Sequence, residues 1–205
     1  MDADRIKKNS IRYFDSLASE NLVIEEPVLC YEAMMEELRS FRFTVLADIG
    51  CGTGEMLKRI RDEYGDDKTL YGVDISPKSI ETAREALGEG AKLLTGDVDD
   101  LPLEDGSVDI VLNMHSFHHY PHPQKSLSEM IRVLKFGGYL LMVENDYSFR
   151  RRMNGNIYHI VRRHHQGDVR MYSADALTRM LRKAGFIVET SKPMADHSRL
   201  YICRK

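Results

Sequence analysis

The chain has 205 residues, and 42% of them are hydrophobic, which suits one globular domain with a sizeable core. Its net charge of -3 and its isoelectric point near 6.2 give no electrostatic case for a nucleic-acid partner. The first ten residues lack the apolar core of a signal peptide, and no apolar run approaches the ~18 residues that span a bilayer. We therefore expect a single cytoplasmic domain over residues 1–205, with no membrane partner.

The three cysteines do not suggest disulfide bonds or a metal site. Cys30, Cys51 and Cys203 are odd in number, widely spaced and without CxxC pairing. Neither disulfide bonds nor a zinc site is therefore predicted, and we expect reduced thiols.

Two helices are predicted before the first strand. The second covers residues 27–41 and begins with Pro27, in the favoured first-turn position. The first covers residues 5–21 and carries an apolar stripe with helical spacing: Ile6, Ile11, Phe14 and Leu17. We expect residues 1–42 to form a helical cap.

Residues 45–55 read VLADIGCGTGE, a pattern typical of a strand, a tight turn and the start of a helix. The glycines at 50, 52 and 54 let the backbone turn sharply and approach a ligand closely. Backbone N–H groups at such a helix start suit an anionic group. The P-loop pattern fails, because no Lys-Ser/Thr pair follows the last glycine. The dinucleotide pattern meets Glu55 where glycine or alanine is required, which disfavours NAD.

The rest of the chain alternates between strand and helix patterns. A helix with Leu57, Ile60 and Tyr64 on one face precedes a strand that closes at Asp74, and Ser76 with Pro77 marks the next helix start. Further strands are predicted at residues 91–97, 107–113, 139–145, 186–191 and 200–205. Between them, one helix runs through Leu127 and Leu134 until Gly137 and Gly138 break it, and a later one stops at Gly185. This alternation predicts an α/β fold with a mostly parallel sheet, whose ligand lies beyond the carboxyl ends of the strands.

Four segments together resemble a known family. DIGCGTG, the acidic strand end in YGVDIS, GDVDDLPLEDGSVDIVLNMHSFHHY and RVLKFGGYLLMVEND resemble, in this order, the class I S-adenosylmethionine-dependent methyltransferases. The small-molecule branch typified by ubiquinone and menaquinone biosynthesis methyltransferases is the most similar. The resemblance implies a Rossmann-like, doubly wound seven-stranded sheet of order 3-2-1-4-5-7-6 with its last strand antiparallel. It also implies S-adenosyl-L-methionine as cofactor and methyl transfer to a small-molecule acceptor.

The resemblance assigns cofactor contacts to several positions. Asp74 is expected to accept from the ribose hydroxyls and Asp48 to lie near the methionyl ammonium, or else to anchor the loop. Asp97 is expected to accept from the adenine amino group, with the backbone of Val98 reaching the ring. The remaining predicted cofactor residues are Gly50, Cys51, Gly52, Ile75 and Asn113.

Other positions near these motifs have competing interpretations. Asp99 and Asp100 are expected to be solvated. Tyr13 and Phe14 lie where the family has a segment that covers the cofactor, and the alternative is that both pack in the core.

A run of histidines follows the fourth strand: His115, His118, His119 and His122. A metal site is not expected, because the run offers no carboxylate ligand and ends in prolines. A neutral imidazole is well matched to removing a proton at pH 7, so His118 and His119 are the catalytic candidates, with a structural turn as the alternative. The (N/D/S)PP(Y/F) signature of adenine-N6 and glutamine amide methylation is absent, since Met114 follows Asn113.

Residues 146–172 lie where the family inserts its substrate-recognition element, and we expect a lid there. Six arginines face only Asp146 and Asp168: Arg150, Arg151, Arg152, Arg162, Arg163 and Arg170. Arginine's fork of donors suits a carboxylate or phosphate, which predicts an anionic acceptor; a solvated helix face or a subunit contact is the alternative. The oligomeric state is not predicted. A cofactor-binding module without catalysis and an NAD-dependent oxidoreductase remain as alternative functions.

Overall fold

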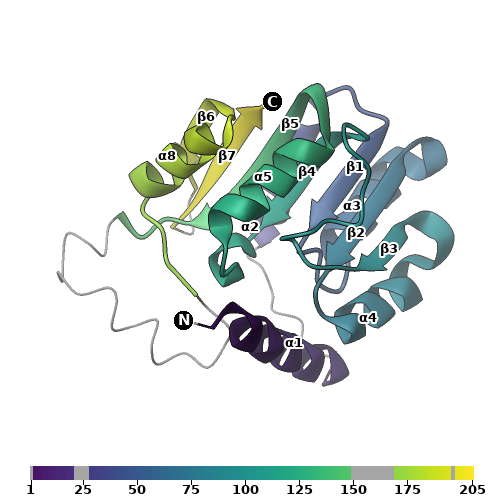
Figure 1. Ribbon diagram of the computed structural model, residues 1–205. Coiled ribbons are helices and arrows are strands. Elements are labelled where there is room, and N and C mark those ends of the chain that lie inside the picture. Colours follow the sequence, from purple (N-terminus) through teal and green to yellow (C-terminus); the bar gives the residue numbers. More distant parts are fainter. Residues whose placement is uncertain (1, 21–27, 149–168, 195–196) are drawn as a thin grey trace.

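The computed structural model describes residues 2–20, 28–148, 169–194 and 197–205. Within these ranges seven strands form one sheet, in the order β3-β2-β1-β4-β5-β7-β6 (Figure 1). β7 is antiparallel to both of its neighbours, and the pairs from β3 to β5 are parallel. This confirms the predicted fold class and strand order. The strands are β1 (Val45–Ile49), β2 (Thr69–Asp74), β3 (Lys92–Thr95), β4 (Val108–Met114), β5 (Leu134–Asn145), β6 (Ile187–Pro193) and β7 (Ser198–Arg204).

Helices cover both faces of the sheet because its strands alternate apolar side chains between two cores. Leu46 packs in one core with α2, α3 and α4, whereas its neighbour Ala47 packs in the other with α5 and α8. None of the helices in the described ranges is both long and apolar enough to cross a membrane. The helices are α1 (Ala3–Ser19), α2 (Val28–Leu38), α3 (Glu55–Tyr64), α4 (Pro77–Leu87), α5 (Pro123–Val133) and α8 (Ala174–Ala184).

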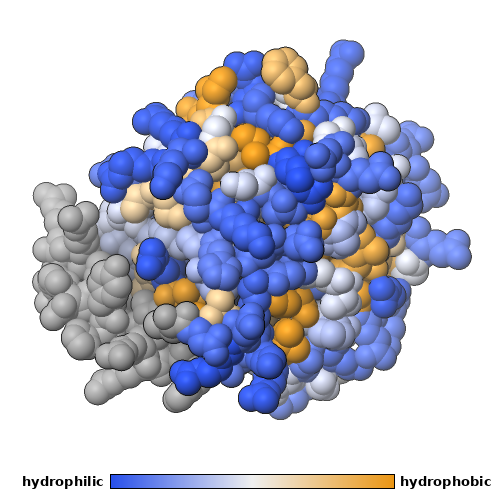
Figure 2. Space-filling model, viewed as in Figure 1, coloured by the Kyte–Doolittle hydropathy of each residue, from blue (hydrophilic) through white to orange (hydrophobic). Residues whose placement is uncertain are grey.

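The two N-terminal helices have different environments. α2 contributes the fully buried Cys30, Met34 and Leu38 to the core. α1 lies beyond the carboxyl ends of the strands, against α4, and its predicted apolar stripe is only half-buried (Figure 1). Since a half-buried stripe leaves side chains available to a ligand, α1 covers a site rather than completing a core. Elsewhere the visible surface is mainly hydrophilic, with smaller apolar areas (Figure 2).

One predicted boundary is wrong. The helix α5 ends at Val133, and Leu134 begins β5 by pairing with Val108 of β4. Gly137 and Gly138 therefore lie inside a strand, at a register shift, rather than at the end of a helix. Gly137 has a φ of 76°, and a Cβ on Gly138 would come within 2.9 Å of the Asp109 carbonyl oxygen. The two glycines thus allow a bend in β5 that the helical spacing of Leu134 concealed.

Candidate active site

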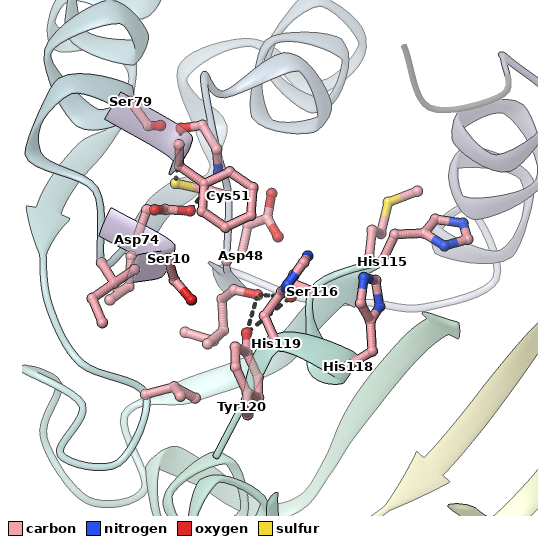
Figure 3. A pocket seen from close by; sticks show the side chains of 18 of the residues that line it. Ser10, Asp48, Cys51, Asp74, Ser79, His115, Ser116, His118, His119 and Tyr120 are labelled. Carbon is pink, nitrogen blue, oxygen red and sulfur yellow. Dashed lines mark hydrogen bonds between the residues drawn. The ribbon is translucent and has the colours of Figure 1, made fainter. Parts of the chain in front are cut away.

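A cavity of about 720 Å³ lies at the carboxyl ends of the parallel strands, beneath α1 (Figure 3). This is where an open α/β sheet places its ligand. Figure 3 shows Asp74 and Ser10 on one side of it and His115 and His118 on the other. The predicted site residues that line it are Asp48, Gly50, Cys51, Gly52, Asp74, Ile75, Asp97, Val98, His118 and His119.

The three glycines of the loop between β1 and α3 have positive φ angles but different neighbours. A Cβ on Gly50 would come within 2.9 Å of the Tyr120 hydroxyl, and one on Gly54 within 2.9 Å of Leu87. A Cβ on Gly52 would meet no protein atom within 4 Å. Gly50 and Gly54 are therefore required by the packing of the protein itself, whereas Gly52 leaves open space beside the cavity.

Asp48, at the end of β1, is a buried carboxylate in the wall of the cavity. Burial, and then the negative charge of Asp74, raise its pKa to about 7. In the described part of the chain no lysine, arginine or histidine forms an ion pair with it. A buried carboxylate without a counter-charge suits a ligand that brings a cation.

Asp74, at the end of β2, supports the glycine loop as well as lining the cavity. Its two oxygens accept hydrogen bonds from the backbone N–H groups of Gly52 and Ser76, each at 2.9 Å. Burial raises the pKa of this carboxyl, although these two hydrogen bonds favour its charged form. The side chain thus fixes the loop against the start of α4.

Asp97, after β3, is held by α1. Its Oδ2 lies 2.7 Å from the Lys7 ammonium, which also pairs with Asp99. Asp99 is only 4% exposed and additionally accepts from His122 Nδ1 at 2.8 Å and from the Ser126 hydroxyl at 3.0 Å. Burial alone would raise the pKa of Asp99, but these partners lower it.

The expectation that Asp99 is solvated is therefore wrong, while Asp100 is exposed as expected. The partners of Asp99 come from α1, from α5 and from His122 just before α5, which local sequence around Asp99 does not indicate.

α1 is anchored at a second point. Asp15 Oδ1 accepts from the Ser76 hydroxyl at 2.6 Å and from the Lys78 N–H at 3.2 Å, at the start of α4. Between its two anchors, Tyr13 and Phe14 line the cavity. The Phe14 ring meets His119 edge-on, with 5.0 Å between the ring centres. Both aromatic residues thus lie on the cavity side of α1 and not in the core.

Asn113 lies behind the cavity instead of lining it. Its fully buried side chain donates from Nδ2 toward the Ile49 carbonyl at 2.8 Å and the Ser116 hydroxyl at 2.7 Å, so it ties the end of β4 to β1. The lining residues at this strand end are Met114, His115 and Ser116. His115 has a φ of 45°, which marks a sharp turn directly after the strand.

Glu144, near the end of β5, is a site residue that the sequence analysis missed. It is 1% exposed, and its Oε1 lies 2.9 Å from His118 Nδ1. Its Oε2 accepts from the His118 backbone N–H at 3.1 Å. Burial alone would raise the pKa of this carboxyl, but His118, His115 and the Asn145 N–H together lower it. The one available signal was an acidic residue closing an otherwise apolar strand, YLLMVEN.

The far end of the cavity is lined by Asn145, Tyr147 and Ser198, with His115. Arg170 is exposed and does not line it, and Asp146 pairs with Arg199 at 2.9 Å. The other arginines of the predicted insertion lie outside the described residues. Across the described ranges, no group of three or more His, Cys, Asp or Glu side chains is arranged as metal ligands.

A sequence family described as a methyltransferase domain matches residues 47–142, from β1 into β5. Demethylmenaquinone methyltransferase of Staphylococcus aureus is 30% identical over 143 residues, which cover 68% of this chain and 58% of that enzyme. The chain belongs to the S-adenosylmethionine-dependent methyltransferases. This confirms the resemblance stated above, and the cofactor of the family is S-adenosylmethionine.

Two solved structures of the family share its fold. A chain from the complex of the Haloferax volcanii Trm112 methyltransferase activator with its methyltransferase has a TM-score of 0.76 and 23% identity, over 95% of this chain and 96% of that one. An Aquifex aeolicus S-adenosylmethionine-dependent methyltransferase has a TM-score of 0.71 and 20% identity, over 100% and 98%.

The residues of the cavity fit the cofactor. S-adenosylmethionine is cationic at its sulfonium and ammonium groups, and its ribose hydroxyls and adenine amine are donors. The strand ends of this methyltransferase present acceptors: Asp48, Asp74 and Asp97. The carboxylate of Asp48, which lacks a basic partner in the described ranges, would gain one from such a ligand.

Proposed function

We propose that the protein transfers the methyl group of S-adenosylmethionine to a small-molecule acceptor. The observation that carries the proposal is Asp48, a buried carboxylate in the cavity wall, whose pKa burial and the charge of Asp74 raise to about 7. The reaction is inferred from membership of the family, and the cavity is the proposed site of that reaction. A cavity of about 720 Å³ lies within the range of small-molecule sites and has room for an acceptor beside the cofactor.

Each end of the cavity has its own role in this proposal. Asp48 holds the methionyl ammonium, Asp74 the ribose hydroxyls, and Asp97 with Val98 the adenine, against which Ile75 packs. The backbone of Gly50, Cys51 and Gly52 lies along the cofactor. The acceptor then occupies the end lined by His118, Asn145 and Ser198.

Methyl transfer requires little covalent chemistry from the protein. The cofactor supplies an already activated methyl group, so the chain must align the acceptor in line with it and exclude water. α1 with Tyr13 and Phe14 supports the second task, because it covers the cavity. The name of the Staphylococcus relative, demethylmenaquinone methyltransferase, supports a small-molecule acceptor.

Several finer expectations remain predictions. The anionic acceptor rests on arginines that lie almost entirely outside the described residues. The cytoplasmic location, the absence of nucleic-acid and membrane partners and the single domain over residues 1–205 are predictions of the sequence. The Haloferax methyltransferase is paired with an activator protein, so a protein partner is a further proposal for this chain to be tested beside the isolated protein.

The alternative functions differ in the cofactor that the protein binds and in whether a methylated product forms. Glu55 begins α3 and lines the cavity, which places a carboxylate where an NAD pyrophosphate would approach. In calorimetry we expect the protein to bind S-adenosylmethionine and S-adenosylhomocysteine but not NADH. Incubation with methyl-labelled cofactor and a cell metabolite extract should then yield a labelled product, identified by mass spectrometry. Binding without a labelled product would favour a non-catalytic module, and binding of NADH alone would favour an oxidoreductase.

A further inference from the structure

The geometry points to Glu144 as a positioning residue that makes His118 the general base of the reaction, and so to an acceptor that must lose a proton from a hydroxyl group or an acidic carbon. This inference rests on the proposed function and narrows the class of its acceptor.

Both oxygens of the Glu144 carboxylate contact His118. Its Oε1 meets His118 Nδ1 at 2.9 Å, and its Oε2 accepts from the His118 backbone N–H at 3.1 Å. The one further donor within the described ranges is the N–H of Asn145, at 2.8 Å from Oε1. No lysine or arginine in those ranges forms an ion pair with Glu144. A neutral glutamine would anchor the same loop at a smaller desolvation cost, so the buried charge requires another explanation.

The contact fixes the protonation pattern of the ring. A carboxylate only accepts hydrogen bonds, so Nδ1 carries the proton and Nε2 of the neutral ring becomes the basic nitrogen. The nearby negative charge also stabilises the imidazolium that forms when Nε2 takes up a proton. His118 lines the cavity, so its ring borders the space in which an acceptor would bind.

The protein contains a second histidine–carboxylate pair, His122 with Asp99, which differs from His118 with Glu144. His122 Nδ1 lies 2.8 Å from Asp99, but Asp99 also pairs with Lys7, so its charge is compensated. His122 is 51% exposed and does not line the cavity. Of these two pairs, only Glu144–His118 lies at the cavity and has a carboxylate with no lysine or arginine partner in the described ranges.

The other titratable groups around the pair are few. His115, at the end of β4, also lowers the pKa of Glu144, and the His119 ring lies 4.0 Å from that of His118. Tyr172, whose pKa burial raises to about 12, is neutral at pH 7. Arg170 donates its backbone N–H to the His118 carbonyl at 3.2 Å. Among the described residues, His115 and His119 are the histidines next to this pair.

The proton balance defines the acceptor. An O–H or C–H bond of the acceptor breaks, its proton goes to His118 Nε2, and its electron pair forms the new bond to the methyl carbon. The carbon–sulfur bond breaks, its electron pair stays on sulfur, and the positive charge ends on the His118 imidazolium beside Glu144. A carboxylate acceptor, already deprotonated at pH 7, would need no such base.

The first test uses the free protein. With ¹⁵N-labelled histidine, NMR should show His118 protonated at Nδ1 when neutral, with a titration midpoint ~1 pH unit or more above that in Glu144→Gln. Asp99→Asn is the matched control, because it removes the other histidine–carboxylate contact and should leave the titration of His118 unchanged. A His118 titration that is indifferent to Glu144→Gln would overturn the inference.

The second test uses the labelled-product assay with the same metabolite extract. Glu144→Gln and His118→Gln should each lower the rate ~100-fold or more at pH 7, partly regained at higher pH where the acceptor ionises unaided. Glu144→Asp should retain more activity than Glu144→Gln, and the affinity for S-adenosylhomocysteine should stay the same in all three. A labelled product whose rate and pH profile ignore both residues would overturn this inference alone. No labelled product from the wild-type protein would overturn the proposed function as well.

Discussion

The two ends of the cavity are built in different ways. The cofactor end uses a glycine loop and three acids, two at the ends of β1 and β2 and one just after β3, so each group is fixed by its own strand. The acceptor end combines side chains from the turn after β4, the end of β5 and the start of β7, which meet only in the folded sheet. One end is therefore specified by local sequence, and the other by tertiary packing.

The largest effect is expected from valine at two of the loop glycines. Gly50→Val should lower thermal stability and abolish binding of S-adenosylhomocysteine, because its Cβ meets the Ser116 and Tyr120 side chains at a positive φ. Gly52→Val should keep much more of the thermal stability, since only backbone strain opposes it, yet it should bind poorly because the side chain enters open space at the cavity. Calorimetry and thermal melts check both. Normal binding by Gly52→Val would place the ligand elsewhere.

Asp48→Asn should raise thermal stability at pH 8 and weaken cofactor binding. The folded pKa of Asp48, about 7, lies above its ordinary value of 3.8, so the folded protein holds an extra proton between these values. Its contribution to stability therefore falls as pH rises from about 4 to about 7, by a few kcal/mol at most. The uncharged variant should melt higher than wild type at pH 8, by ~2–4 °C per kcal/mol. It should bind S-adenosylhomocysteine ~30-fold or more weakly through loss of a buried charge pair. A lower melting temperature at pH 8 would contradict this account of Asp48.

Lys7→Met should have a smaller effect that is confined to the cofactor end. Lys7 holds α1 to Asp97 and Asp99, so its loss should speed the release of S-adenosylhomocysteine ~3–10-fold, measured by stopped flow. Lys8→Met, at an exposed neighbouring position, is the matched control. Tighter binding by Lys7→Met would mean that Lys7 competes with the cofactor for Asp97.

The smallest effect concerns the acceptor end. If the acceptor is anionic, Arg162→Ala with Arg163→Ala should raise its KM ~3-fold or more, and more strongly at low salt, while cofactor affinity stays unchanged. A KM that is indifferent to the double substitution at low salt would exclude these two arginines from recognition of the acceptor.

The same contrast explains what the sequence could predict. Local patterns predicted the glycine loop and Asp74. The family resemblance supplied the expectation for Asp48 and also the strand order, and the structure confirms that order. The environment of Asp99 could not be predicted, because Lys7 lies 92 positions away. Glu144 was missed because its role depends on His118, which approaches it only when β4 and β5 pair. Leu134 fits a helical period, but pairing with Val108 places it in β5.

The most direct test of the central claim is the affinity for S-adenosylhomocysteine, measured by calorimetry from pH 6 to pH 8. If the ligand's ammonium pairs with Asp48, binding requires the charged carboxylate, which a pKa of about 7 leaves mostly protonated at pH 6. Affinity should therefore rise ~10-fold from pH 6 to pH 8 in the wild type and stay nearly flat in Asp48→Asn. A wild-type affinity that does not change with pH, or a rise that persists in Asp48→Asn, would contradict the assignment of this cavity to the cofactor's cationic end.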